Sequence, residues 1–264
     1  MTAQIPNLDD LFRSAHAEGE LSTTALKTLT INAEMGVSIQ AGLGVAPDDV
    51  PSSEVLLVTL MPDDSGSIRA SGSADVVRQG HNLVLDALRR SRQKDDILVH
   101  TRYLSGQVLF PYRLLRDAVE MDARNYNPDK GTPLYDQMAV LLGTVLAKTR
   151  EFEASGVPVR SVTLVISDGA DLHSTRQKPK TLKPLVEDML RLETHIVAAM
   201  GIDDGSTNFK KVFREVGIPD RWILTPGNTP GEIRSAFQAF SQSAVRASQG
   251  AAGFHQAAVG GFGG

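Results

Sequence analysis

Apolar residues in the middle of the chain form strand-length runs that alternate with segments of helical spacing. Val55–Met61 is almost unbroken in its apolar character, and Val159–Ser167 is a second segment of this kind. Such runs are typical of strands buried on both faces of a sheet. Residues 74–92 and 134–152 instead repeat their apolar positions with the period of a helix. Repeated strand–helix units predict an α/β fold, with a doubly wound, mostly parallel sheet and helices on both faces.

The same reasoning predicts the other elements of this sheet. Strands are expected at residues 97–104, 107–112, 195–202 and 222–225, and helices at residues 182–192, 208–216 and 230–247. Ser105 and Gly106 separate the first two of these strands, which indicates a hairpin. Trp222, at the start of the last strand, is expected in the core.

Both ends of the chain depart from the strand–helix pattern. Residues 7–17 have helical spacing, but the odd positions from Leu29 to Leu43 are apolar and the even positions are polar or glycine. This alternation predicts a half-buried strand, or a hairpin bent at Gly36, added to the sheet edge or offered to a second copy of the chain. We therefore divide the chain into an N-terminal extension (1–52), a main domain (53–247) and a Gly/Ala-rich tail (248–264) that we expect to be mobile.

Composition narrows the classes of function. The 264 residues carry a net charge of −4 and contain no cysteine, which excludes disulfides and thiolate chemistry. No dense cluster of lysine and arginine is present, so a nucleic-acid partner is not expected. No apolar stretch is long enough for a membrane span, and the first residues do not resemble a secretory signal. A cytoplasmic location is the resulting expectation.

Oxygen-bearing side chains follow the two buried strands and precede the long helix. Asp63, Ser65 and Ser67 come after the first strand, Asp168 comes after the second, and Thr132 lies just before residue 134. The carboxyl ends of parallel strands meet at one edge of a sheet, where ligands bind. Two carboxylates and three hydroxyls suit a hard cation, so we expect Mg²⁺ here, with Mn²⁺ or Ca²⁺ as alternatives.

Two further acids stand near this set. Asp64 is in the same loop but is expected to point away as a solvated charge. Asp171 is interpreted either as an outer partner of the site or as a helix-cap or loop residue.

These three loops resemble the metal-ion-dependent adhesion site of the von Willebrand factor A domain, and of its cytosolic bacterial type in particular. The resemblance rests on Asp63-x-Ser65-x-Ser67, Gly131-Thr132-Pro133 and Ser167-Asp168-Gly169, in this order at the expected element boundaries. It implies that Asp63, Ser65, Ser67, Thr132 and Asp168 hold the cation, and that an acidic side chain of a protein partner completes its coordination. It also implies binding without catalysis, in stress-response, metal-resistance or ATPase-associated complexes.

Two other functions remain as alternatives. A Mg²⁺-dependent phosphohydrolase of the haloacid dehalogenase type needs a second aspartate two residues after its nucleophile, and Ser65 occupies that position. An RNA-binding platform on the same fold is disfavoured by the acidic net charge. We therefore do not expect an enzyme.

Overall fold

A six-stranded sheet forms the centre of the computed structural model, which describes residues 7–30 and 33–263. Its strand order is β3-β2-β1-β4-β5-β6, and every neighbouring pair is parallel except β2 and β3. The strands are β1 (Val55–Met61), β2 (Ile97–Arg102), β3 (Val108–Leu114), β4 (Val159–Ser167), β5 (His195–Gly201) and β6 (Ile223–Leu224). The predicted α/β class with a mostly parallel sheet is confirmed.

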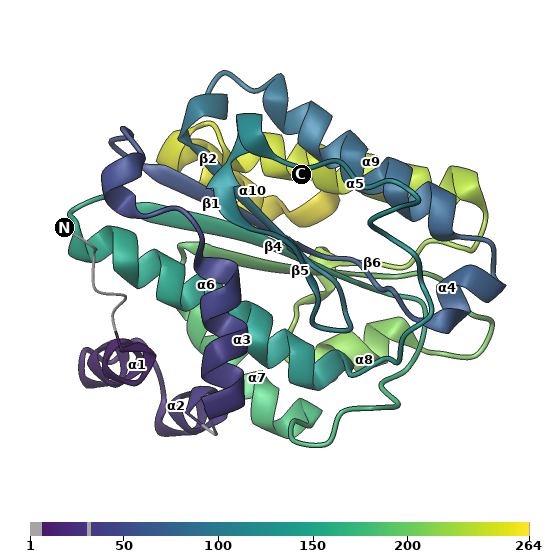
Figure 1. Cartoon of the computed structure of the whole chain (residues 1–264), viewed down its shortest axis with the longest axis horizontal. Helices are drawn as coiled ribbons and strands as arrows, with labels where there is room; N and C mark the ends of the chain where they lie inside the picture. The colour runs from purple at the N-terminus through teal and green to yellow at the C-terminus, as the bar shows by residue number, and fades with distance from the viewer. Residues whose placement is uncertain (1–6, 31–32, 264) are drawn as a thin grey trace.

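Helices cover both faces of this sheet. Figure 1 shows α5, α9 and α10 on one side and α3, α6, α7 and α8 on the other. Their bounds are α4 (Gly66–Ala70), α5 (Ala74–Arg89), α6 (Leu134–Ala154), α7 (Pro179–Arg191), α8 (Phe209–Glu215), α9 (Pro230–Ala247) and α10 (Gly250–Gly260). Helix α6 is buried along most of its length because it lies between the sheet and the N-terminal helices. In the described part of the chain, none of the helices has the length and apolar character needed to cross a bilayer.

The register of the central strands sets the position of the loops that follow them. Strand β1 lies between β2 and β4, and all its residues are buried. Met61, the last residue of β1, pairs with Val165 near the end of β4. The segments after β1 and β4 therefore leave the sheet side by side at the same edge.

The N-terminal extension is helical, so the predicted strand or hairpin over residues 29–43 was wrong. The described residues form α1 (Leu8–Ala17), α2 (Thr23–Leu29) and α3 (Ala33–Leu43), while residues 31 and 32 of the predicted strand lie outside them. Met35, Ile39 and Leu43 are buried, whereas Val37 is 66% exposed. A spacing of four residues satisfies both a period of two and one helix face, which explains the misleading alternation.

Helix α3 covers the outer strand of the sheet. The backbone N–H of Val45 donates to the carbonyl of Tyr112 in β3 at 2.9 Å. The buried guanidinium of Arg102 donates from Nη2 to the carbonyl of Ser38 at 2.8 Å. The described residues of the extension thus contain no strand, and the segment that follows α3 is hydrogen-bonded to the outer strand β3 at Tyr112.

The described C-terminal segment forms a helix that packs on the domain, where the sequence predicted a mobile tail. Helix α10 follows α9 and buries Phe254, which is 2% exposed. The ring of Phe262 lies edge-on to Trp222, with 4.9 Å between the ring centroids. Trp222 is buried as predicted, but it ends a short 3₁₀ helix before β6 instead of starting the strand. A Cβ atom on Gly253 or Gly261 would collide with the backbone of Arg246 or Arg221, so glycine permits this packing.

Candidate metal centre

Asp63 joins the loop after β1 to the loop after β4. Its carboxylate is fully buried, and Oδ1 accepts the backbone N–H of Ser65 at 2.8 Å. Oδ2 accepts the Ser167 hydroxyl at 2.9 Å and the backbone N–H of Asp168 at 3.3 Å. One side chain therefore holds both loops in a fixed relative position.

Ser65, Ser67 and Asp168 bring their side-chain oxygens together beside this clamp. Ser67 Oγ donates to Asp168 Oδ1 at 2.6 Å, and Ser65 Oγ lies 3.4 Å from the same oxygen. The two serine hydroxyls are 2.9 Å apart. Hydroxyl and carboxylate oxygens without sulfur or imidazole are the donor set of a hard cation. The residues present therefore fit the predicted ion.

Thr132 lies in a third loop that is paired with the first. Ser65 and Lys130 form an isolated parallel bridge, in which the N–H of Gly66 donates to the carbonyl of Lys130 at 3.1 Å. Thr132 follows two residues later and is 6% exposed. Its backbone N–H donates to Nδ1 of His173 at 2.8 Å. The pairing of the two loops therefore places Thr132 near Ser65, Ser67 and Asp168. Among the described residues, its hydroxyl makes no hydrogen bond to these three side chains.

Burial raises the pKa of both predicted carboxylate ligands. The pKa of Asp168 rises to about 6, chiefly through burial and further through the nearby charges of Asp63 and Asp204. Burial also raises the pKa of Asp63, against the hydrogen bonds donated by Ser65 and Ser167. Two buried carboxylates close together favour either protonation or a bound cation, because each relieves their repulsion.

The structure contradicts the prediction that Asp64 is a solvated charge, and it favours one of the two interpretations of Asp171. Asp64 is buried and its Oδ1 accepts the backbone N–H of Ser105 at 2.8 Å, so it is not a solvated charge. Asp171 accepts from Ser174 Oγ at 2.6 Å and from the N–H of Tyr135, in the first turn of α6, at 3.4 Å. It therefore has the loop and cap role.

Two residues that support the site were not found by sequence reasoning. The hydroxyl of Tyr126 donates to the carbonyl of Asp63. His173 accepts the hydrogen bond from Thr132 already described. Neither residue lies in a motif, and each reaches the site only because separate loops fold together, so no local pattern indicates its role.

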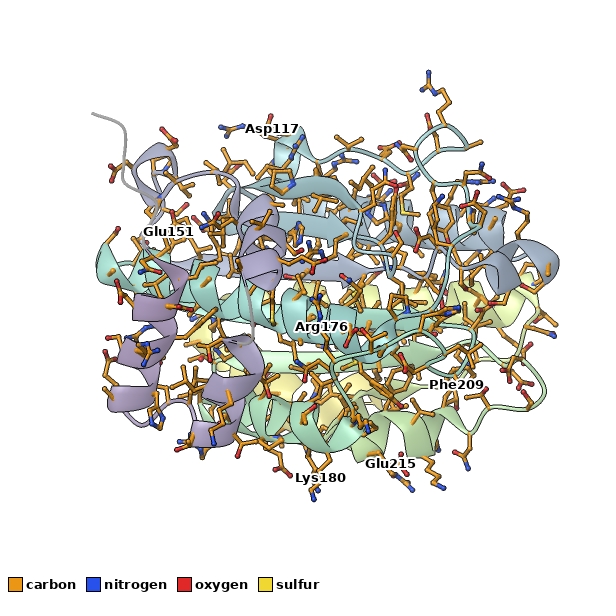
Figure 2. The ribbon with its side chains drawn as sticks, turned by 60° about the horizontal axis from the view of Figure 1, so that its bottom comes forward. Asp117, Glu151, Arg176, Lys180, Phe209 and Glu215 are labelled. Carbon is orange, nitrogen blue, oxygen red and sulfur yellow. The ribbon has the colours of Figure 1, made fainter. Side chains whose placement is uncertain are left out.

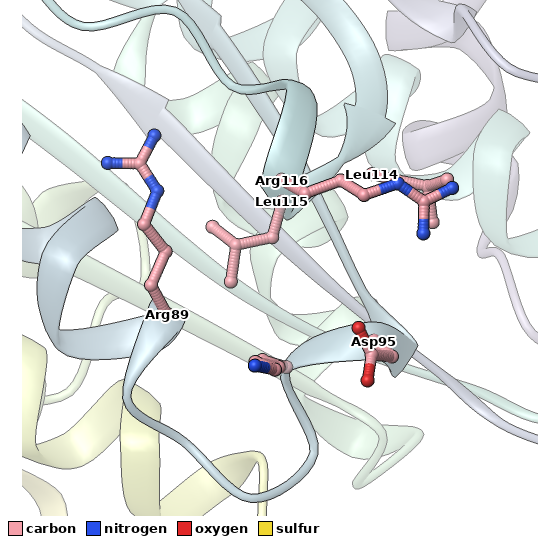
Figure 3. A pocket seen from close by; sticks show the side chains of 6 residues that line it. Arg89, Asp95, Leu114, Leu115 and Arg116 are labelled. Atoms are coloured by element: carbon pink, nitrogen blue, oxygen red, sulfur yellow. The ribbon is translucent and has the colours of Figure 1, made fainter.

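The candidate centre combines two carboxylates with hydroxyls and is not built on a larger cluster of acids or histidines. In the residues the structure describes, no group of three or more histidines or acids is placed to hold a metal ion. A cavity of about 410 Å³ lies near the amino end of β2 and is lined by Arg89, Lys94, Asp95, Leu114, Leu115 and Arg116 (Figure 3). Arg89 there pairs with Asp86 at 3.1 Å and Glu120 at 3.0 Å, which neutralises its charge.

Comparisons with known proteins support the fold. No protein-family model matches the chain, and no curated protein matches it. Among solved structures, the pilus adhesin SpaC of Lactobacillus rhamnosus GG, in its open conformation, is similar with a TM-score of 0.52 and 16% identity, over 74% of this chain and 30% of that chain. This chain therefore spans less than a third of the adhesin.

Two other solved structures are similar at lower TM-scores. Proximal thread matrix protein 1 from the mussel byssus, with a zinc-occupied MIDAS motif, has a TM-score of 0.45 and 14% identity over 74% of this chain and 47% of its own. The SpRpn10 VWA domain has a TM-score of 0.47 and 10% identity over 71% of this chain and 95% of its own. The likeness to the adhesin shows the fold alone. Together with the sheet order, it agrees with the α/β fold that the resemblance to the von Willebrand factor A domain implies.

Proposed function

We propose that this chain is a protein-binding module that holds Mg²⁺ at Asp63, Ser65, Ser67, Thr132 and Asp168 and uses it to recognise an acidic side chain of a partner. The observation that carries the proposal is the convergence of the Ser65, Ser67 and Asp168 oxygens beside the Asp63 clamp. Mn²⁺ and Ca²⁺ are alternatives that the same oxygens would accept.

The chemistry of the donors explains why a carboxylate is the expected ligand. When bound, the cation supplies positive charge and a coordination position open to an outside oxygen. Ser65 and Ser67 would contribute neutral oxygens, which leave most of that charge for the partner. Asp63 is committed to Ser65, Ser167 and Asp168 through its hydrogen bonds and orients the loops around the ion.

Binding without turnover is the second part of the proposal. A phosphohydrolase needs a free aspartate as nucleophile, but both oxygens of Asp63 accept hydrogen bonds from the surrounding loops. Ser65 stands where that enzyme class needs its acid. We place the module in the cytoplasm, with a protein partner and no nucleic acid, in a stress-response, metal-resistance or ATPase-associated complex.

Titration calorimetry with Mg²⁺ tests the site. We expect Asp63→Asn to weaken Mg²⁺ binding at least about tenfold, which is the usual cost of losing a ligand or its orienting partner. Asp64→Asn is the matched control, because Asp64 is the adjacent buried acid but is bonded to Ser105. Equal Mg²⁺ binding by wild type and Asp63→Asn would contradict the assignment.

A comparison of captured proteins tests the partner. Protein captured from source lysate in Mg²⁺ should be released by EDTA, and Asp63→Asn should capture it in neither condition. An identical set of captured proteins with and without EDTA would exclude recognition through the ion. Metal-dependent phosphatase turnover that is lost in Asp63→Asn would favour the enzyme instead.

A further inference from the structure

Leu172 is a large apolar side chain that the fold leaves in solvent beside the candidate metal centre. It is 76% exposed and belongs to neither hydrophobic cluster of the described residues. It follows Asp168 by four positions, in the loop after β4. A single exposed leucine needs no explanation by itself. What distinguishes Leu172 is the set of hydrogen bonds that holds its backbone, and its position next to Thr132.

Hydrogen bonds fix the backbone of Leu172 directly to a predicted ligand. The N–H groups of Leu172 and His173 both donate to the carbonyl of Thr132, at 3.2 and 3.3 Å. The N–H of Thr132 donates back to Nδ1 of His173 at 2.8 Å. Leu172 is therefore held beside Thr132 by a closed set of bonds that does not involve its own side chain.

The rest of this loop is attached to the start of α6. The carboxylate of Asp136 accepts the N–H groups of Thr175, Arg176 and Gln177 at 2.9, 3.1 and 2.6 Å. Arg176, labelled in Figure 2, also reaches Glu34 of α3 at 2.5 Å. A loop fastened at this many points presents Leu172 at low entropic cost to a binding partner.

Three other large apolar side chains are exposed in the described residues, and their positions can be compared with that of Leu172. Val37 lies on α3, Val119 follows a 3₁₀ helix after β3, and Val259 lies on α10. None of these elements contributes a predicted ligand. Leu172 alone among the four is hydrogen-bonded through its backbone to one, Thr132.

From this geometry we propose that Leu172 is a specificity residue, so that the module selects an acidic residue with an apolar side chain at a neighbouring position of the same partner segment. This inference rests on the proposed function, because the acidic residue is the one that the cation would bind. The carboxylate would reach the ion while the adjacent apolar group covers Leu172. Removal of both apolar surfaces from water would add affinity that a carboxylate alone lacks.

Selection from a random peptide library tests the proposal. The immobilised full chain is exposed to the library in Mg²⁺ and bound peptides are eluted with EDTA. We expect the eluted peptides to share an aspartate or glutamate next to leucine, isoleucine, valine or phenylalanine. For a selected peptide, we expect Leu172→Ser to lower the affinity about five- to tenfold and to abolish the apolar preference in a new selection. Mg²⁺ affinity and thermal unfolding should stay unchanged.

Val259→Ser is the matched control, since Val259 is similarly exposed at 66% but lies on α10. It should select the same peptides as wild type. Acidic peptides without an apolar neighbour, or an unchanged preference in Leu172→Ser, would overturn this inference and leave the proposed function intact. Failure to recover any peptide that EDTA releases would overturn both.

Discussion

Ser67 Oγ donates a 2.6 Å hydrogen bond to Asp168 Oδ1 across 101 positions of the chain. The two residues meet because β1 and β4 are parallel neighbours whose carboxyl ends lie level, with Met61 opposite Val165. The hydroxyl partly compensates the buried charge, yet burial and the nearby acids still raise the pKa of Asp168 to about 6. Because its negative charge is only partly compensated, the site favours a bound cation. The effect of this charge on the free energy of unfolding can be measured.

Neutralising Asp168 should stabilise the protein when metal is removed. The pKa of Asp168, raised in the folded state, favours folding at low pH, and this contribution is lost as the pH rises through about 6. In EDTA at about pH 7.5, we expect Asp168→Asn to raise the free energy of unfolding by about 1–3 kcal/mol, with a smaller gain near pH 4.5. Urea denaturation at both pH values measures this.

Saturating Mg²⁺ should reverse the order of the two proteins. Wild type would then gain stability from the bound ion, whereas Asp168→Asn would gain little. Loss of stability in Asp168→Asn in EDTA at the higher pH would contradict the argument, because it would mean that the carboxylate is stabilising without a cation.

His173 should position Thr132 through its hydrogen bond. In His173→Ala the N–H of Thr132 loses the acceptor that lies 2.8 Å away, and we expect the Mg²⁺ affinity to fall about three- to tenfold, corresponding to one neutral hydrogen bond. Asparagine offers an oxygen acceptor near the same place, so His173→Asn should restore most of the affinity. Calorimetry on the three proteins tests this, and equal loss in both variants would point to a role other than accepting this bond.

Acid should destabilise the protein through its buried histidines. Burial lowers the pKa of His195 to about 4, where its Nδ1 lies 2.7 Å from Ser161 Oγ. Below about pH 6.5 the unfolded chain binds a proton that the folded chain refuses until about pH 4, so the free energy of unfolding falls by about 1.4 kcal/mol per pH unit for this residue. His195→Asn should remove that share of the slope in urea denaturation between about pH 7 and pH 5.

The exposed residue His255 provides the control for this pH effect. His255→Asn makes the same exchange of histidine for asparagine at that exposed position, and its unfolding is measured alongside. His81, whose pKa burial also lowers to about 4, keeps its own contribution in both variants. An unchanged slope in His195→Asn would show that protonation of this histidine is not linked to unfolding.

The C-terminal helix should contribute measurably to stability. Phe254 is 2% exposed, and the guanidinium of Arg160 lies over its ring at 6.0 Å. We expect Phe254→Ala to lower the free energy of unfolding by about 3–4 kcal/mol, and Val259→Ala, at an exposed position of the same helix, to change it by less than about 0.5 kcal/mol. A mobile tail would give no difference between the two variants, and thermal or urea unfolding decides.

The sequence by itself determined the central strands of the sheet and the loops that follow them. Strands β1 and β4 begin and end at the predicted residues, because runs buried on both faces must be almost wholly apolar wherever they occur. Asp63, Ser65, Ser67 and Asp168 could be grouped for the same reason, since parallel strands deliver their following loops to one edge. Those inferences need only the apolar pattern along each strand and the parallel direction of neighbouring strands.

Tertiary structure alone decided the conformation of the extension and the surroundings of the site. Met35, Ile39 and Leu43 fit a strand and a helix equally well in sequence, and only packing on α6 and β3 selects the helix. The burial of Asp64 and the bond from Thr132 to His173 likewise depend on contacts between distant segments. A pattern along the chain records which side chains avoid water, but it does not record which distant surface they meet.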